Sequence, residues 1–278
     1  MPEFFQGKIP IIRRSLDEGF IRGTPDEKPS FGCVPRDFDE DPVAMRDSPD
    51  AMELVDPSTY DAWFDQQEET KSSLQHIYLP GDGSKPTFEY LDQDGFPDCW
   101  AHSTAHAVML NRAAMNLPPI RFNAVAVATL LKRVDGGWSG LSLKFGREHG
   151  FPVIGTDPGE WPYQSRKGKD TPELRASMAL HTVAEDWYDL GKREWDQTLS
   201  EKQLFTCSAN NWATPTDYNA YGHAMCMLRK VRIERGRWGR LTLNSWQGFG
   251  YHGLCVIPDD VARVDGAVAI RSSTPSVS

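Results

Sequence analysis

Long apolar runs are missing from the chain, and so is the start of a secretory signal. No stretch of its 278 residues approaches the ~20 consecutive apolar residues that a helix needs to cross a bilayer. The first residues, MPEFFQ, have no basic region followed by an apolar core. We therefore expect no membrane partner and no export by the usual signal.

Paired cysteines are also missing. The five cysteines are an odd number, are widely scattered and form no C-x-x-C pair, which argues against both a disulfide framework and a zinc site. A reducing compartment fits best, so we expect the cytoplasm or the interior of a virion, and neither a metal nor another cofactor. The cysteines are Cys33, Cys99, Cys207, Cys226 and Cys255.

A basic stripe of the kind that binds nucleic acid is absent, because the lysines and arginines are dispersed. The net charge of −9 is concentrated between Asp37 and Glu69, where twelve acidic residues and one arginine give −11 and leave +2 for the rest of the chain. Nucleic acid is therefore not an expected partner. The acidic segment is instead a candidate docking element for a protein partner or for self-assembly.

Composition divides the chain into three parts. Residues 1–75, rich in Pro, Asp and Glu, are expected to form an extended arm with one short helix near Ser58–Gln67. Residues 76–265 are expected to form the main domain, and residues 266–278 a C-terminal tail. With 39% hydrophobic residues, the chain can build a substantial core.

The main domain has helical patterns first and strand patterns later. From His76 the pattern suggests loop and strand, and short apolar pieces divided by glycine then predict antiparallel strands in the last third. Helices followed by a sheet indicate an α+β fold. The expected helices cover 99–116, 122–133, 141–149, 171–184 and 199–206, and the expected strands 223–233, 240–244 and 254–257.

Cys99 stands where a loop broken by glycine and proline enters a helical pattern. The first N–H groups of a helix have no partner within it, and together with the macrodipole they favour a thiolate. A cysteine at this junction is therefore a candidate nucleophile. The alternative is one more buried cysteine on a core helix.

A base for this thiol is expected from the sheet. His223 begins one strand of a predicted hairpin, and Asn244 ends the neighbouring strand. An imidazole can take the thiol proton while an Asn side-chain oxygen accepts from its other ring N–H.

Several stretches in the same order resemble the papain family of cysteine peptidases. They are Gln93 six residues before Cys99, the run Cys-Trp-Ala-x-Ser from Cys99, Gly222-His223-Ala224, and Asn244-Ser245-Trp246 followed by Gly-aromatic-Gly. The likeness extends through Asp135-Gly136-Gly137-Trp138 and Trp161-Pro162-Tyr163, and covers about residues 88–257. Phe31–Asp37 is also similar to the Gly-Trp-x-Pro-Asp segment of some prokaryotic members.

The resemblance implies a two-lobe fold in which a helical lobe packs against an antiparallel sheet, with peptides or proteins as substrates. It implies a catalytic triad in which Cys99 is the nucleophile, His223 the base and later the acid, and Asn244 the orienter of His223. Gln93 would stabilise the oxyanion together with the Cys99 N–H, an interaction worth ~3 kcal/mol in comparable sites. The implied substrate-binding residues are Gly136, Gly137, Ala224 and Trp246. Gly137 would leave room for the substrate backbone, and Trp246 would shield the Asn–His hydrogen bond from water.

The departures from the family pattern carry their own expectations. Family members have a disulfide between positions that are Phe96 and Val134 here, and two apolar residues suit a reduced compartment. The usual Gly-Ser before the nucleophile is Pro97-Asp98. Asp98 is expected to raise the pKa of Cys99, and weak or narrow activity would follow.

Three functions are left open by the sequence. The first is a thiol endopeptidase that acts through a Cys99 acyl-enzyme. The second is a structural or assembly protein, for example a virion component, that keeps the fold with restricted or lost activity. The third is another thiol chemistry on the same arrangement, such as amide hydrolysis in cell-wall peptides or acyl transfer.

Overall fold

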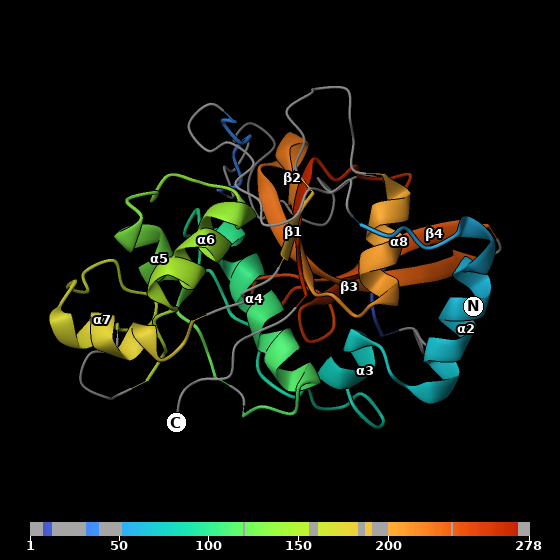
Figure 1. Ribbon diagram of the computed structural model, residues 1–278, viewed down its shortest axis with the longest axis horizontal. Helices are drawn as coiled ribbons and strands as arrows, with labels where there is room; N and C mark the ends of the chain where they lie inside the picture. Colours follow the sequence, from blue (N-terminus) through green and yellow to red (C-terminus); the bar gives the residue numbers. More distant parts are fainter. Residues whose placement is uncertain are drawn as a thin grey trace.

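The computed structural model describes residues 8–12, 32–38, 52–118, 120–155, 161–182, 187–190, 200–234 and 236–271. The expectations for the acidic stretch 39–51 and for residues 272–278 fall outside this part of the chain. The described residues form two lobes, one of helices and one built on a sheet (Figure 1). No helix in the described ranges is both long and apolar enough to span a bilayer.

The elements follow the α+β order expected from the sequence. The helical segments are η3 (Pro57–Thr59), α2 (Tyr60–Thr70), α3 (Leu74–Tyr78), α4 (Cys99–Ala114), α5 (Ala124–Leu130), α6 (Ser139–His149), α7 (Pro172–Ala179), α8 (Glu201–Ala209) and η4 (Asn219–Tyr221). The strands are β1 (Trp187–Asp189), β2 (Thr214–Tyr218), β3 (His223–Glu234), β4 (Arg237–Leu243), β5 (Leu254–Pro258) and β6 (Gly266–Ile270).

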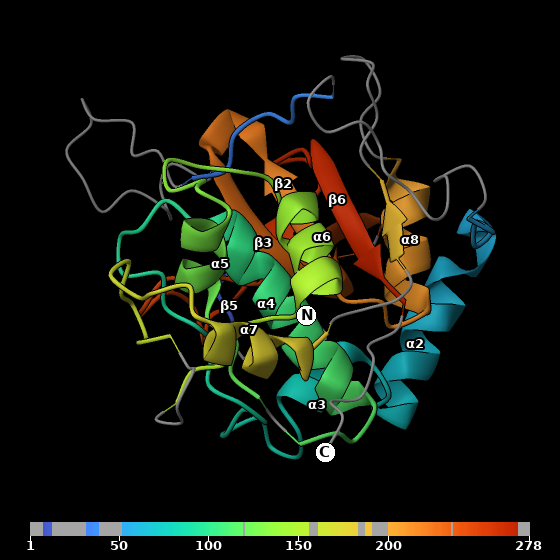
Figure 2. The ribbon, with the colours of Figure 1, turned by 60° about the vertical axis from the view of Figure 1, so that its left-hand side comes forward.

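The sheet is antiparallel throughout, with the strand order β1-β6-β2-β3-β4-β5. Helix α4 packs on β3 and β2, and α8 packs on β3 as well. Figures 1 and 2 show α4 and α8 on opposite faces of the sheet. Because both faces are covered, β3 is buried along almost its whole length, and its side chains divide between two apolar clusters.

Helix α4 is the central element of the helical lobe. It contains no glycine or proline, and every residue from Cys99 to Arg112 is buried. It packs against α3, α5 and α6 as well as the sheet, so its polar residues are buried together with its apolar ones. The first residue of α4, Cys99, therefore lies where the helical lobe meets the sheet.

Part of the acidic segment pairs with basic residues of the sheet. On α2, Asp61 and Asp65 bind Arg232 at 2.8 and 2.6 Å, and Glu68 binds the buried Arg229 at 2.5 Å. These contacts neutralise charge that the sequence assigns to a docking element. The described part of this segment is thus joined to the domain itself.

The first described piece of the arm, residues 8–12, extends the sheet. Ile12 N–H donates to the Val256 carbonyl and Val256 N–H donates to the Pro10 carbonyl, both at 2.9 Å. Since β5 is an edge strand, this piece covers backbone groups that would otherwise be open to pairing with another chain.

Two expectations about the elements differ from the structure. The strand expected after His76 is wrong, because α3 runs to Tyr78 and the described residues 79–98 contain only turns and loop. Gly266–Ile270, which the sequence places in the tail, form β6 between β1 and β2. Strands β1, β2 and β6 have three to five residues, and such short pieces give little periodicity in sequence.

Candidate active site

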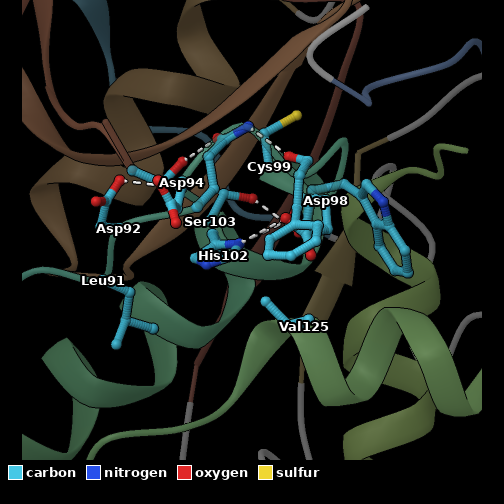
Figure 3. Close-up of polar contacts among 12 residues, drawn as sticks. Leu91, Asp92, Asp94, Asp98, Cys99, His102, Ser103 and Val125 are labelled. Carbon is cyan, nitrogen blue, oxygen red and sulfur yellow. Dashed lines mark hydrogen bonds and ion pairs between the residues drawn. The ribbon is translucent and has the colours of Figure 1, made fainter. Parts of the chain in front are cut away.

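The Cys99 side chain lies between the two residues that flank His223. Its sulfur accepts the Ala224 N–H at 3.3 Å and lies 3.9 Å from the Gly222 carbonyl oxygen. Figure 3 shows the sulfur at the start of α4, directed away from the His102 ring. The structure therefore places the helix cysteine against the beginning of β3, as two facing lobes require.

The His223 ring is held in one tautomer by Asn244. The Asn244 Oδ1 atom lies 2.9 Å from His223 Nε2 and also accepts the Ser245 N–H at 2.8 Å. A backbone N–H can only donate, so the atom it meets is the oxygen, and His223 Nε2 must be the donor. Nδ1 is then the basic nitrogen of the neutral ring.

Trp246 covers the His223–Asn244 pair. Its ring is 4.8 Å from the His223 ring, centroid to centroid, and tilted by 34°. Phe249 supports Trp246 edge-on at 6.2 Å. The hydrogen bond between His223 and Asn244 is buried, and a hydrogen bond is electrostatically stronger in such surroundings than in water.

Ser245 holds the Gln93 side chain in place through a hydrogen bond. The Ser245 hydroxyl donates to Gln93 Oε1 at 2.6 Å, and Gln93 Nε2 donates to the Phe96 carbonyl at 2.8 Å. The backbone adds a bond from Gln93 N–H to the Ser245 carbonyl. Ser245, which follows Asn244 in the chain, thus connects Gln93 to Asn244. The sequence did not reveal this link.

The two glycines of the 136–137 pair act differently from one another. A Cβ on Gly137 would lie 2.7 Å from the Trp100 ring, so this glycine is needed for packing against α4. A side chain on Gly136 would instead meet the arm. There a Cβ would lie 2.8 Å from the Gly32 carbonyl oxygen.

Solved structures of low sequence identity share the fold of this chain. Xylellain, a cysteine protease from Xylella fastidiosa, matches with a TM-score of 0.57 at 14% identity, over 94% of this chain and 98% of that one. The chain has the papain-like fold. Procathepsin L2 proteinase from the Tenebrio molitor larval midgut matches with a TM-score of 0.53 at 13% identity, over 97% and 86%.

Procathepsin L 3 of the same midgut gives a TM-score of 0.52 at 14% identity, over 78% of this chain and 87% of that one. No protein-family profile and no curated protein matches the sequence. The likeness therefore establishes the papain-like fold, and the chemistry has to be argued from the residues.

A segment of the arm crosses the cleft of the papain-like fold. Cys33 N–H donates to the Gly222 carbonyl at 2.9 Å, Val34 N–H to the Gly137 carbonyl at 3.0 Å, and Gly137 N–H to the Gly32 carbonyl at 2.8 Å. Residues 32–34 thus bond to both lobes, and the segment 32–38 lies close to α6 and β2 (Figure 2). Cys99 has no exposed surface.

Burial sets the protonation of the Cys99–His223 pair in this closed state. Loss of solvent raises the pKa of Cys99 well above its ordinary value, outweighing the Ala224 N–H. Loss of solvent also lowers the pKa of His223 to about 4, against the opposing effect of Asn244. The closed site therefore holds a neutral thiol and a neutral imidazole.

Asp98 affects Cys99 less than the sequence suggests. Its charge does raise the pKa of Cys99, but burial and the charge of Asp217 weigh more. The Asp98 carboxylate lies 3.3 Å from His102 Nδ1, and both side chains are buried. Burial lowers the pKa of His102, yet the charge and hydrogen bonding of Asp98 prevail and leave it raised.

The second histidine of α4 has a different partner. His106 Nε2 accepts the Leu91 N–H at 2.8 Å, and burial lowers its pKa well below the ordinary value. His102 and His106, which are four residues apart on α4, thus bind different partners, Asp98 and the Leu91 N–H. The described residues contain no cluster of three or more His, Cys, Asp or Glu that could hold a metal ion.

Asp98→Asn is expected to lower the free energy of unfolding by about 2 kcal/mol, because it removes the charged partner of a buried histidine. The raised pKa of His102 means that the pair stabilises fully below the ordinary histidine pKa and loses its contribution as pH rises through the raised value. Urea unfolding at pH 6 and pH 9 should therefore show the larger loss at pH 6. Equal losses in Asp98→Asn and in the exposed control Asp94→Asn would contradict this expectation.

Arg166 joins the two positions at which the papain family has its disulfide. Its guanidinium lies 4.8 Å from the Phe96 ring centroid and donates to the Val134 carbonyl at 2.9 Å. All five cysteines are free. The side chain of Arg166 thus connects the loop before Cys99 to the loop before Gly136 without a covalent bond, which the sequence did not predict.

Proposed function

We propose that this chain is a papain-like cysteine peptidase that hydrolyses peptide bonds through a Cys99 acyl-enzyme, and that its own arm keeps it latent. The observation that carries the proposal is the position of the Cys99 sulfur between Gly222 and Ala224. The residue between them is a histidine whose tautomer is set by Asn244. This combination supplies a nucleophile, a base and an orienter.

In the first step, His223 Nδ1 accepts the thiol proton while the sulfur attacks the substrate carbonyl carbon. The protonated ring then gives that proton to the leaving amine, and an acyl-enzyme forms on Cys99. Water attacks the thioester with His223 acting again as base, which releases the acid product and regenerates the thiol. Asn244 orients the ring in both halves of the reaction.

The oxyanion of each tetrahedral intermediate would be stabilised by two donors. One is the Cys99 backbone N–H at the start of α4, where the helix macrodipole also favours negative charge. The other is a side-chain N–H of Gln93, whose amide is oriented by Ser245 and Phe96. Donors that are already oriented stabilise the developing charge without reorganisation.

The arm supports latency because it uses the groups that a bound peptide would need. Gly137 N–H and C=O and the Gly222 carbonyl are all bonded to residues 32–34. Recognition of an extended peptide depends on such main-chain groups. A substrate must therefore displace this segment, which also agrees with an activity that is restricted in the full chain.

The alternative function, a structural or assembly protein, is supported by the same observation. A protein that keeps the fold for assembly does not need an accessible Cys99. Deleting residues 1–70 would not separate the two readings, because Ile9, Met52 and Phe64 are buried in the core. A test has to leave the whole chain in place.

The test is labelling of the full chain with a peptidyl epoxide, followed by mapping of the adduct by mass spectrometry. Cys99 is expected to be alkylated faster than any other cysteine, and prior alkylation with a small thiol reagent should block the adduct. Cys207, Cys226 and Cys255 serve as internal controls, because they are as fully buried as Cys99. A protein in which Cys99 reacts no faster than these three is not a thiol peptidase.

A further inference from the structure

Two buried carboxylates, those of Asp217 and Asp189, lie on the face of the sheet that is next to Cys99. In the ladders, Ala224 pairs with Asp217, Asp217 with Gly266, and Val268 with Asp189. Paired residues share a face of a sheet, and so do residues two apart in one strand. A single face therefore carries Asp217 and Asp189 in a row that begins beside Cys99, whose sulfur accepts the Ala224 N–H.

Gly266 leaves the space between the carboxylates open. A Cβ at this position would lie 3.3 Å from Asp217 Oδ2. Asp217 is fixed from the other side by Ser139, whose hydroxyl and N–H donate to its two oxygens at 2.6 and 3.3 Å. Burial and the charge of Asp189 raise the pKa of Asp217 to about 6. A cation at this place would lower the pKa of Asp217 again, because it would stabilise the charged carboxylate.

The arm supplies that cation. Arg36 donates to Asp189 Oδ2 at 2.5 Å, and the two side chains are only 11% and 7% exposed. The guanidinium also lowers the pKa of Asp217, so its charge is felt at both acids. Arg36 follows Cys33 by three residues, which is about 10 Å of extended chain.

When the arm leaves the cleft, the acids lose this partner. Two carboxylates of like charge would then lie on one face of the sheet without the Arg36 charge beside them. The Arg36 charge lowers the pKa of Asp217 in the closed protein, so the open state favours a ligand that brings its own cation. Arginine fits better than lysine, because its planar guanidinium can spread several N–H donors over a carboxylate.

We infer that Asp189 and Asp217 form a subsite for an arginine side chain, occupied by Arg36 in the closed protein and by an arginine of the substrate peptide in the open one. The arm then acts as a pseudosubstrate, and the substrate class is peptides with arginine within a few residues of the cleaved bond. This inference rests on the proposed function and specifies its selectivity.

The test compares arginine with its neutral isostere citrulline. Tetrapeptidyl acyloxymethyl ketones carry one or the other at the second, third or fourth residue from the reactive carbon, and the rate of Cys99 labelling is measured on the full chain. At one of these positions at least, arginine is expected to react at least tenfold faster than citrulline. Asp189→Asn should reduce this ratio to near one.

Arg36→Gln is the matched control for loosening of the arm. Both Arg36→Gln and Asp189→Asn break the ion pair, so both should raise the rate with citrulline probes, but only Asp189→Asn should abolish the preference for arginine. Asp135→Asn, at an exposed acid beside Gly136, controls for general attraction of a cationic probe and should keep the ratio. Should Asp189→Asn fail to fold, Asp217→Asn takes its place and should also lower the ratio.

The outcomes separate the inference from the function. Labelling of Cys99 at equal rates by arginine and citrulline probes at all three positions overturns the inference and leaves the peptidase intact. A preference that survives both aspartate substitutions also overturns it. Failure of every probe to label Cys99 overturns the proposed function and the inference together.

Discussion

His223→Ala is expected to lower kcat/KM for a fluorogenic peptide amide by about 10⁴-fold, because the thiol loses its base and the leaving amine loses its acid. Burial already favours the neutral thiol at Cys99, so little thiolate forms without a proton acceptor. The rate should be measured in the natural chain and in Gly32→Ala. In both, the loss is expected to appear mainly in kcat.

Asn244→Ala should cost less than His223→Ala, because Trp246 still packs on the imidazole ring while the tautomer is no longer set. We expect a loss of about 100-fold. His149→Ala, at an exposed histidine at the end of α6, controls for unspecific effects and should leave kcat/KM within twofold. If His223→Ala retained more than a tenth of the parent activity, the base would have to be another group.

The sequence predicted well those parts that depend on local pattern. Helix α7 begins at the start of the helix expected over 171–184, with the Thr171 hydroxyl accepting the Leu174 N–H at 3.2 Å. Strands β3, β4 and β5 and their antiparallel pairing follow the apolar pieces divided by glycine. Long periodic segments carry enough information to be assigned without their neighbours.

What the sequence could not predict depends on contacts between distant residues. The ion pair of Arg36 with Asp189 joins residues 153 positions apart, and neither belongs to a recognisable pattern. Arg166 connects Phe96 and Val134 through a ring contact and a backbone carbonyl, which no spacing rule describes. Such contacts are set by the packing of whole elements, and that packing leaves no local signal in the chain.

The closed cleft explains why the departures before the nucleophile are tolerated. Pro97 lies against the arm, because its carbonyl is the group that a side chain on Gly32 would meet first. Asp98 binds His102 inside the helical lobe, on the side of α4 away from the sulfur in Figure 3. The two residues therefore support the closed state and the helix start, and they leave the face of Cys99 toward His223 unchanged.

A methyl group added at Gly32 is expected to displace the arm, because there is no room for a side chain at this position. A Cβ there would lie 1.9 Å from the Pro97 carbonyl oxygen, a backbone atom fixed just before α4, and the residue has φ of +99°. The positive φ alone costs about 1–2 kcal/mol for an L-residue, and the contact adds to it. The strain is relieved when residues 32–38 leave the cleft, and of these residues only Cys33 belongs to an apolar cluster.

Gly32→Ala is therefore expected to raise the rate of Cys99 alkylation by iodoacetamide at least about 30-fold, which corresponds to about 2 kcal/mol in favour of the open state. Renewed access of water should lower the pKa of Cys99 and raise that of His223, so the pH profile of alkylation should move to lower pH. Gly95→Ala is the matched control, because Gly95 also has a positive φ of +78° but a Cβ there would meet no atom within 4 Å. Equal rates and profiles for the two variants would show that residues 32–38 do not limit access to Cys99.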